Sequence, residues 1–359
     1  MVILATDLGK AKSLFCWYQT EDQRHEFKPV PSTPQAFRDA LTGRAADRVA
    51  IEVCDMAGWV ADLCRTLGIP IEVADANGEG WRWRHVKNKT DRTDGLKLAR
   101  LSAAGDLATV RVPDRPARHY KALVLYRHRL VERRTRVKNA IHALLVAEGR
   151  AVLGRAAWRP ESMAALRAWA RPVGECATKD ELWAGHLHLE LGQLDHLQEQ
   201  IDQLDARLDA LGEADARVVR LRTIPGVGPR LAELVVAVLD DPERFRSARQ
   251  VSAYAGLVPR RYQSGQVDRS GRISKAGCGK LREVLVQVAW GMLQHNPHGR
   301  GVFQRISKGQ RTRRKQAAVA LARRVLCWGW AMLRDGTDWH EPIPRRRAEP
   351  VPVPVPVPA

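Results

Sequence analysis

The sequence predicts an α/β fold in which an N-terminal domain with a mixed β-sheet is followed by a mainly helical region. Over roughly the first 80 residues, short apolar runs typical of strands alternate with helical segments. Two long stretches with apolar residues at three- and four-residue steps follow, and they predict long helices. Beyond them, turns that contain Gly and Pro separate further helical segments.

The N-terminal elements can be placed one by one. Strands are expected at 2–9, 12–19 and 25–30, a helix at 33–43, a strand at 48–54, a helix at 58–68 and a strand at 69–75. This order of strands and helices suggests a mixed sheet. Residues 90–101 have helical spacing and predict one more helix.

Composition limits the possible functions. Lys and Arg number 59 against 40 Asp and Glu, and the formal net charge of +19 favours nucleic acid as the partner. There is no uninterrupted apolar stretch of about 18 residues and no signal-peptide pattern, so we expect a cytoplasmic protein without a membrane role. The six cysteines have no Cys-x-x-Cys pair and are expected to be reduced and mostly buried.

The two long helices carry opposite charge. The stretch 118–147 is basic and predicts a helix whose Arg133, Arg136 and Lys138 face nucleic acid, the alternative being a merely solvated face. The stretch 187–211 is acidic, with leucines near heptad spacing, and predicts a coiled coil or helical hairpin that contacts protein. The alternative is a helix packed within its own domain.

These patterns suggest four segments. Residues 1–148 form an α/β domain with the basic helix, and residues 149–213 form a linker with the coiled coil. Residues 214–335 form a mainly helical domain, and residues 336–359 form a Pro-rich tail expected to be extended and polyproline-like.

Acidic residues at the ends of predicted strands suggest a metal site. Asp7 and Glu52 each end an apolar strand-like run, and Asp91 and Asp94 lie three apart at a predicted helix start. Hard cations such as Mg²⁺ take carboxylate oxygens, and acids crowd together only if a cation compensates their charge. The bases around the acid pair, which would let a phosphate approach, are Lys87, Lys89 and Arg92.

A second motif lies at 220–239. Its apolar–Pro–Gly–apolar–Gly core, followed by an apolar helix, is the helix-hairpin-helix pattern. Gly226 and Gly228 would allow a tight turn whose N–H groups bind a phosphate at the next helix N-terminus. A simple turn between two core helices is the alternative.

A third motif is the stretch 248–290. Ser264 is expected in an irregular, Gly-flanked loop with Arg260, Arg261, Arg269, Arg272 and Lys275 near in sequence. A serine among cations can attack a phosphodiester, because the cations stabilise the charge that builds on the phosphate. Serine is common in loops, so this pattern alone is weak.

Taken together, the blocks resemble one family. The stretches are ATDLG, IEVC, KTDRTDGLKLARL, LVERRTRVKNAIHALL, TIPGVGP, AYAGLVPR and SGQVDRSGRISKAGCGKLRE, in this order from Ile3 to about Leu333. The chain resembles the transposases of insertion-sequence family one-hundred-ten, which are bridge-RNA-guided serine recombinases with a DEDD, Holliday-junction-resolvase-like domain. The resemblance implies an N-terminal fold of the RNase H and resolvase type.

The resemblance also implies roles for individual residues. Asp7, Glu52, Asp91 and Asp94 match the DEDD acids that hold Mg²⁺, and Ser264 matches the serine that forms a phosphoserine link to a DNA 5′ end. Donor DNA, target DNA and a noncoding bridge RNA are the implied partners, with a homodimer that assembles to a tetramer on nucleic acid.

Two other functions remain open at this point. A Holliday-junction resolvase-like magnesium nuclease would use water and would not need Ser264, and a covalent protein–DNA adduct would exclude it. A non-catalytic RNA- or DNA-binding protein would bind without cleaving strands in magnesium.

Overall fold

The computed structural model describes residues 1–76, 78, 90–150, 158–265 and 267–340. These residues divide into two compact units, one up to His119 and one from Tyr120 onward. Each unit is described by itself. The predicted segment boundaries at 148, 213 and 335 stay predictions, and most of the Pro-rich tail lies outside the described residues.

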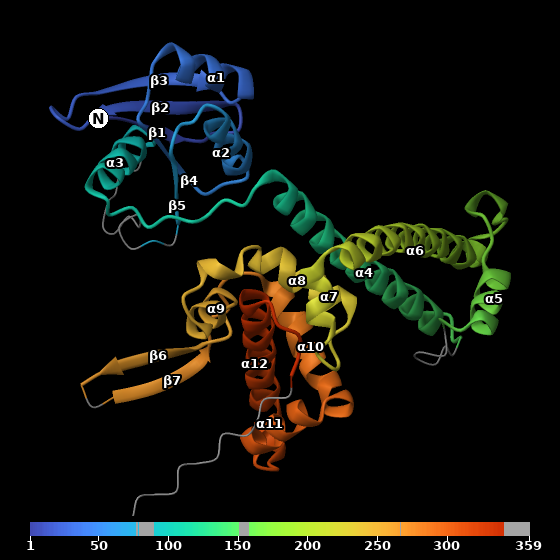
Figure 1. Ribbon diagram of the computed structural model, residues 1–359. Helices are drawn as coiled ribbons and strands as arrows, with labels where there is room; N and C mark the ends of the chain where they lie inside the picture. Colours follow the sequence, from blue (N-terminus) through green and yellow to red (C-terminus); the bar gives the residue numbers. More distant parts are fainter. Residues whose placement is uncertain (77, 79–89, 151–157, 266, 341–359) are drawn as a thin grey trace, which may run out of the picture. The chain divides into compact units, whose positions relative to one another are not determined.

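Unit 1 is built on a five-stranded mixed sheet with strand order β3-β2-β1-β4-β5 (Figure 1). Strands β1, β2 and β3 pair antiparallel, while β4 pairs parallel with both β1 and β5. The predicted mixed sheet is therefore confirmed. The strands are β1 (Val2–Asp7), β2 (Lys12–Gln19), β3 (His25–Pro31), β4 (Arg48–Glu52) and β5 (Ile71–Ala74).

Helices cover both faces of this sheet. Helices α1 (Pro34–Gly43) and α2 (Ala57–Thr66) bury one face over Leu4, Phe15 and Ile51. Helix α3 (Asp91–Ala104) buries the other face over Ile3, Ala5 and Cys16. The neighbouring residues Leu4 and Ala5 lie in different cores because successive strand residues point to opposite faces.

Gly95 of α3 faces β2 with room for a methyl group. A Cβ at Gly95 would lie 3.4 Å from Cys16 Cβ and 3.8 Å from Phe27 Cε1, which are ordinary contacts. We expect Gly95→Ala to stabilise unit 1 by about 1 kcal/mol, because Ala loses less backbone entropy in a helix. The thermal midpoint should rise by a few degrees.

The matched control for Gly95→Ala is Gly58→Ala in α2. A Cβ there would lie 2.9 Å from Arg118 Nε and would disturb the ion pair of Arg118 with Asp62. The thermal midpoint of Gly58→Ala should not rise above that of the wild type. A lower midpoint for Gly95→Ala would mean that α3 cannot accept a methyl group against β2.

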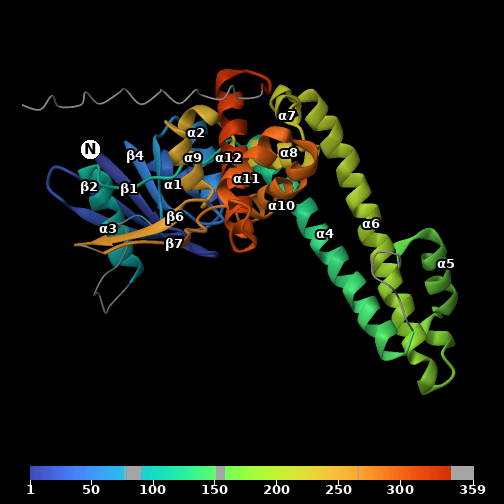
Figure 2. The same cartoon turned by 90° about the horizontal axis from the view of Figure 1, so that it is seen from below.

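Unit 2 consists of a long helical arm, a helical bundle and one β-hairpin (Figures 1 and 2). The arm contains α4 (Arg115–Ala147), α5 (Pro160–Trp169) and α6 (Leu182–Ala214), with short 3₁₀ turns η2 (Val173–Glu175) and η3 (Lys179–Glu181). The bundle contains α7 (Ala216–Arg222), α8 (Pro229–Leu239), η4 (Pro242–Arg244), α9 (Ala248–Tyr254), α10 (Gly279–His295), α11 (Pro297–Ser307), η5 (Arg311–Arg313) and α12 (Arg314–Asp335). The hairpin strands are β6 (Pro259–Ser264) and β7 (Val267–Ile273).

Two apolar cores hold unit 2 together. The bundle core gathers the apolar face of α8 with residues of α10 and α12, such as Leu234, Leu285 and Leu321. The arm has its own core, in which Val137 and Ile141 of α4 pack with Leu187, Leu191 and Leu194 of α6. The helical region beyond the sheet is thus confirmed.

Candidate active site and nucleic-acid surfaces

The first two predicted acids lie at neighbouring strand ends. Strands β1 and β4 are parallel, with Ala5 opposite Ala50 and Thr6 opposite Ile51. One step further, this register brings Asp7 opposite Glu52. Both residues continue the side of the sheet to which Ala5 and Ala50 belong, which is the face covered by α3.

The other two acids lie in the first turn of α3, at the same edge. The C-terminal end of α3 is fixed near the start of β4, since the Ser102 carbonyl accepts a hydrogen bond of 3.2 Å from Arg48 Nη1. Asp91 is eleven residues earlier, about 17 Å along the helix, so the first turn lies toward the strand ends. Asp94 is 7% exposed, whereas Asp91 is exposed to solvent.

The donor chemistry of these acids fits a hard cation, but the side chains are not gathered. Among the residues that the structure describes, no three Asp, Glu, His or Cys side chains are placed to hold a metal ion. Asp7 and Glu52 end neighbouring strands on the face that α3 covers, and Asp91 and Asp94 lie in the first turn of α3. The convergence of these four acids on Mg²⁺ stays a prediction. Of the bases expected around them, Arg92 lies over the Phe27 ring at 5.6 Å, and Lys87 and Lys89 lie outside the described residues.

Ser264 lies in a β-strand, so the prediction of an irregular loop is wrong. It ends β6 and pairs with Val267, the first residue of β7, and Gly265 directly after it has φ +55°. Every residue of β6 is exposed. The prediction failed because a hairpin without a buried face has no alternation of apolar and polar residues to reveal it.

The hairpin register decides which side chains can help Ser264. Tyr262 and its partner Arg269 lie on the same face as Ser264, because residues two apart share a face. Arg261 lies on the opposite face and pairs with Asp268. Arg261, one of the five predicted bases, therefore points away from Ser264, and Asp268 neutralises its charge.

The remaining bases near the serine lie closer to the base of the hairpin. The register shifts by one residue between Pro259 and Arg261, so Arg260 opposes Gly271 and Arg272 in a β-bulge. Arg260 Nη2 donates to the Ser274 carbonyl at 3.3 Å, and Arg272 is exposed. Two hydrophobic neighbours were missed by the sequence reasoning: Tyr262 is 65% exposed and Val267 is 40% exposed on the Ser264 face.

The hairpin is fixed at its base by two glycines. Gly256 and Gly277 have φ values of +67° and +65°, and a Cβ at Gly277 would lie 2.2 Å from the Tyr254 carbonyl oxygen. Lys275 N–H donates to the Gly256 carbonyl at 3.1 Å, and Ser274 N–H donates to the Val258 carbonyl at 2.8 Å. Lys275 is thus part of the backbone junction, with an exposed side chain.

The basic helix α4 is partly neutralised within its own unit. Arg127 makes two hydrogen bonds of 2.9 Å to Asp205 of α6, and Arg134 Nη1 donates to Gln198 at 2.7 Å. Lys138 lies over the Trp158 ring at 4.7 Å, and burial lowers the pKa of its amine. Lys138 was predicted to face nucleic acid, but its side chain is half-buried and already contacts Trp158.

Arg133 and Arg136 remain exposed on this helix. They line a groove of about 460 Å³ between α4 and α6, together with Tyr126, Gln193, His196 and Gln200. A groove with cations, an aromatic ring and amides suits a nucleic-acid strand.

The leucine stripe of α6 is buried against the arm's own core. Leu187, Leu191 and Leu194 are at most 5% exposed and pack with α4. Arg127 pairs with Asp205 while Arg134 bonds Gln198, so the two helices run antiparallel. The helix packs within its own unit, in an antiparallel helix pair like that of a helical hairpin, so this stripe gives no reason to expect an oligomer. The coiled coil stays a prediction.

The motif at 220–239 forms two helices joined by a tight turn. Gly226 has φ +91°, and a Cβ there would lie 3.1 Å from Met292 Cγ, so this glycine is needed for close packing on α10. Gly228 begins α8 as its N-cap and is exposed, with nothing within 4 Å of a Cβ built on it. The Pro225 carbonyl accepts a hydrogen bond of 3.1 Å from Asn296.

A buried carboxyl lies in α8, the helix that follows this turn. Glu233 of α8 is 1% exposed, 3.3 Å from Arg230, and burial raises its pKa to about 7. Arg230 also pairs with Asp205 and Asp209 of α6. These charges join α8 to the helical arm.

Glu233 should make unit 2 less stable as the pH rises. Its pKa is raised in the folded protein to about 7 from an ordinary value of 4.5, so the folded state holds the proton more tightly. Stability therefore falls between about pH 4.5 and 7 and stays lower above pH 7. Glu233→Gln should flatten this dependence and stabilise the protein at pH 8 by on the order of 2 kcal/mol.

Chemical denaturation at pH 5 and pH 8 measures this effect. Glu213→Gln, on the exposed surface of α6, is the matched control and should change neither value. A Glu233→Gln protein that is less stable than wild type at pH 8 would show that the charge pair with Arg230 outweighs the cost of burial.

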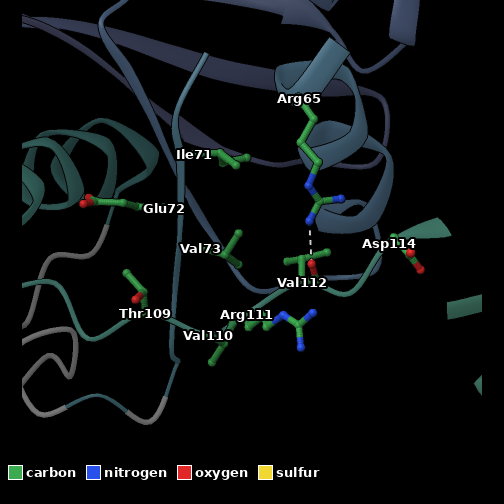
Figure 3. Close-up of a pocket in the computed structure, with 9 residues that line it drawn as sticks. All are labelled: Arg65, Ile71, Glu72, Val73, Thr109, Val110, Arg111, Val112 and Asp114. Atoms are coloured by element: carbon green, nitrogen blue, oxygen red, sulfur yellow. Dashed lines mark hydrogen bonds between the residues drawn. The ribbon is translucent and has the colours of Figure 1, made fainter. Parts of the chain in front are cut away.

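Unit 1 also has a surface cavity. It has a volume of about 710 Å³ and is lined by β5 and the segment 109–114 (Figure 3). Arg65 of α2 reaches across it to donate to the Val112 carbonyl. It contains none of the predicted acids, and we assign it no role.

The fold and the position of the acids define a class. An α/β unit with carboxylates at adjacent ends of parallel strands, followed by a basic helical unit, is compatible with a nuclease-like enzyme that acts on nucleic acid. Across the part of the chain that the structure describes, no helix is long and apolar enough to cross a membrane.

Comparison with known proteins specifies the family. The model of the transposase IS116/IS110/IS902 family matches residues 218–304, and the DEDD transposase model of IS110 elements matches residues 4–148. The y4rJ protein of Sinorhizobium fredii, named as a transposase, is 30% identical over 83% of this chain and 80% of its own length. The transposase for insertion sequence element IS1111A of Coxiella burnetii is 30% identical over 79% of this chain and 77% of its own length.

A third relative, the transposase for insertion sequence element IS1328 of Yersinia enterocolitica, is 29% identical over 80% of this chain and 84% of its own length. The chain belongs to the IS110 family of transposases. Membership implies cleavage and transfer of DNA strands.

Proposed function

We propose that this transposase is a recombinase that cleaves and rejoins DNA through a phosphoserine intermediate. The observation that supports this most directly is the placement of Ser264. Its hydroxyl lies at the tip of an exposed hairpin fixed at its base, with Arg269 on the same face. A nucleophile that must reach a DNA backbone needs such a projecting position.

The chemistry conserves the energy of the broken bond. Ser264 Oγ attacks the phosphorus, its proton passes to a base, and the DNA 3′ oxygen leaves as a protonated 3′ hydroxyl. The 5′ phosphate is then joined to the serine. In the reverse step a 3′ hydroxyl attacks the phosphoserine and releases Ser264, so strands are rejoined without ATP. Water would give the same cleavage but lose this energy.

The acids of unit 1 would supply the second part of the site. Asp7, Glu52, Asp91 and Asp94 would hold Mg²⁺, which stabilises negative charge on a phosphate when it is bound. Asp7 and Glu52 end paired strands and Asp94 lies in the helix turn at the same edge. The acids and the serine belong to different units, and we propose that they are completed into one site on DNA, within one subunit or between subunits of a dimer that assembles to a tetramer.

RNA guidance is part of the proposal. Arg133 and Arg136 in the groove between α4 and α6 offer a surface for a noncoding bridge RNA. The exposed N-terminus of α8 at Gly228 would hold a phosphate, as in a helix-hairpin-helix. Neither Arg133 nor Arg136 is one of the proposed catalytic residues, so binding and cleavage can be tested independently.

The test is a reaction with supercoiled DNA that carries the element ends and a target, with the flanking noncoding RNA and magnesium. We expect joined product and a DNA strand covalently attached to the protein, found by mass spectrometry on the peptide that contains Ser264. Nicked DNA with free 5′ phosphate and no adduct would favour the nuclease that uses water. Binding without cleavage would favour the non-catalytic protein.

A further inference from the structure

One strongly basic surface is not used by the proposed site. No Asp or Glu occurs between Glu283 and Asp335, while this stretch contains ten Lys or Arg residues. Five of the ten are exposed around the connection between α11 and α12, which we call the α11–α12 basic turn: Arg305, Lys308, Arg311, Arg314 and Lys315. Both family matches end before the connection itself, since the match to the IS116/IS110/IS902 family model stops at residue 304.

The backbone presents these bases closely together. Helix α11 ends with Lys308 in the left-handed region at φ 51°, followed by Gly309 at φ +72°. A single 3₁₀ turn, η5, then leads directly into α12 at Arg314. The guanidinium of Arg314 lies over the Trp290 ring at 5.7 Å, and Trp290 is itself 36% exposed. The turn therefore displays cations beside an exposed aromatic ring.

Two of these charges, Arg314 and Lys315, lie at the unfavourable end of a long helix. The first turn of α12 contains Arg314 and Lys315 and no acid, although the N-terminus of a helix favours negative charge. No side chain caps this N-terminus. Among the described residues, none of the five bases forms an ion pair with an acid. A bound polyanion would relieve this repulsion.

We propose that the α11–α12 basic turn binds the phosphate backbone of duplex DNA. Duplex DNA carries one negative charge per about 1.7 Å of its axis. A dense cluster of Lys and Arg side chains can therefore neutralise several phosphates at once. Lys and Arg contacts to phosphate fix position without reading sequence, so this contribution is independent of DNA sequence. The proposal rests on the family's action on DNA, and it uses neither Ser264 nor the acids of unit 1.

The test compares two triple variants with the same loss of charge. Lys308→Gln, Arg311→Gln and Lys315→Gln together remove bases of the turn and leave Arg314 on Trp290. Arg44→Gln, Arg167→Gln and Arg171→Gln form the control, because each of these arginines is already paired, with Glu26, Asp195 and Glu181 respectively. Binding of each full-length protein to a short duplex of unrelated sequence is measured over a salt series.

We expect the variant of the turn to lose duplex affinity by about tenfold or more at low salt. The slope of log affinity against log salt should become shallower by roughly 0.9 for each lost phosphate contact, and we expect the loss of two to three contacts. The control should change less than about twofold. Unchanged affinity and slope in the variant of the turn would overturn the proposal. So would a loss seen with single-stranded RNA and not with duplex DNA.

A charge reversal separates binding from folding. Lys315→Glu places an acid in the first turn of α12, so its thermal midpoint should equal or exceed that of the wild type while DNA affinity falls. A midpoint that falls together with affinity would contradict the electrostatic account. Ser264→Ala should keep full duplex binding, so a failed cleavage mechanism and a failed DNA surface give different results.

Discussion

Ser264→Ala is expected to abolish strand cleavage and the covalent protein–DNA product, with a loss of at least about 10³-fold. The reason is that the variant has no oxygen to form the phosphoserine, and the hairpin turn around it is unchanged. DNA binding should stay within about twofold, because Ser264 is uncharged and contributes little to phosphate affinity. Cleavage of labelled DNA and denaturing gels of the adduct measure both effects.

Ser270→Ala is the matched control for this change. Ser270 is an exposed serine of the same hairpin, but it pairs with Arg261 and lies on the opposite face. The Ser270→Ala variant should cleave and join DNA at the wild-type rate. Recombination by Ser264→Ala at the wild-type rate would falsify the serine mechanism and leave the nuclease that uses water as the better description.

Asp94→Asn should also impair cleavage strongly, through the metal-binding half of the proposed site. Asp94 is 7% exposed and lies in the first turn of α3, at the edge where Asp7 and Glu52 end their strands. An amide keeps the size but removes the negative charge that a hard cation needs. We expect cleavage to fall by about 10²-fold or more, comparable to the loss of a metal-orienting group, with DNA binding nearly unchanged.

The role of Asp94 in binding magnesium can also be tested without DNA, from the effect of magnesium on thermal stability. A ligand that binds only the folded state raises the thermal midpoint, so magnesium should stabilise the wild type and fail to stabilise Asp94→Asn. Asp106→Asn, at the exposed end beyond α3, is the control and should respond like the wild type. Equal stabilisation of all three proteins by magnesium would remove Asp94 from the metal site.

The sheet of unit 1 could be predicted from the sequence because its strands have buried faces. All five strands and the three helices were expected near their observed positions, since apolar periodicity records burial directly. Strands β6 and β7 have no such signal, as Val267 and Tyr262 remain exposed. A strand stabilised only by its partner and by fixed ends leaves little trace in hydrophobic pattern.

The charged surface could be predicted only in part. The basic face of α4 was visible in the sequence, but the partner of Arg127 is 78 residues away, so sequence reasoning could not tell neutralised bases from exposed ones. The α11–α12 basic turn shows the opposite case. Its charge needed no long-range knowledge, because absence of acids over 284–334 is visible in the sequence. The cysteines were expected to be mostly buried, yet only Cys16 and Cys64 are.

The number of residues in strands β6 and β7 sets both how far Ser264 projects from the bundle and which face of the hairpin it lies on. Each strand residue adds about 3.3 Å of reach and turns the next side chain to the other face. Lengthening both strands by two residues would move the hydroxyl outward by about 7 Å with the same orientation, whereas one residue in each would point it backward. Evolution of this nucleophile's reach is therefore confined to even steps, while the glycines at its base can stay as they are.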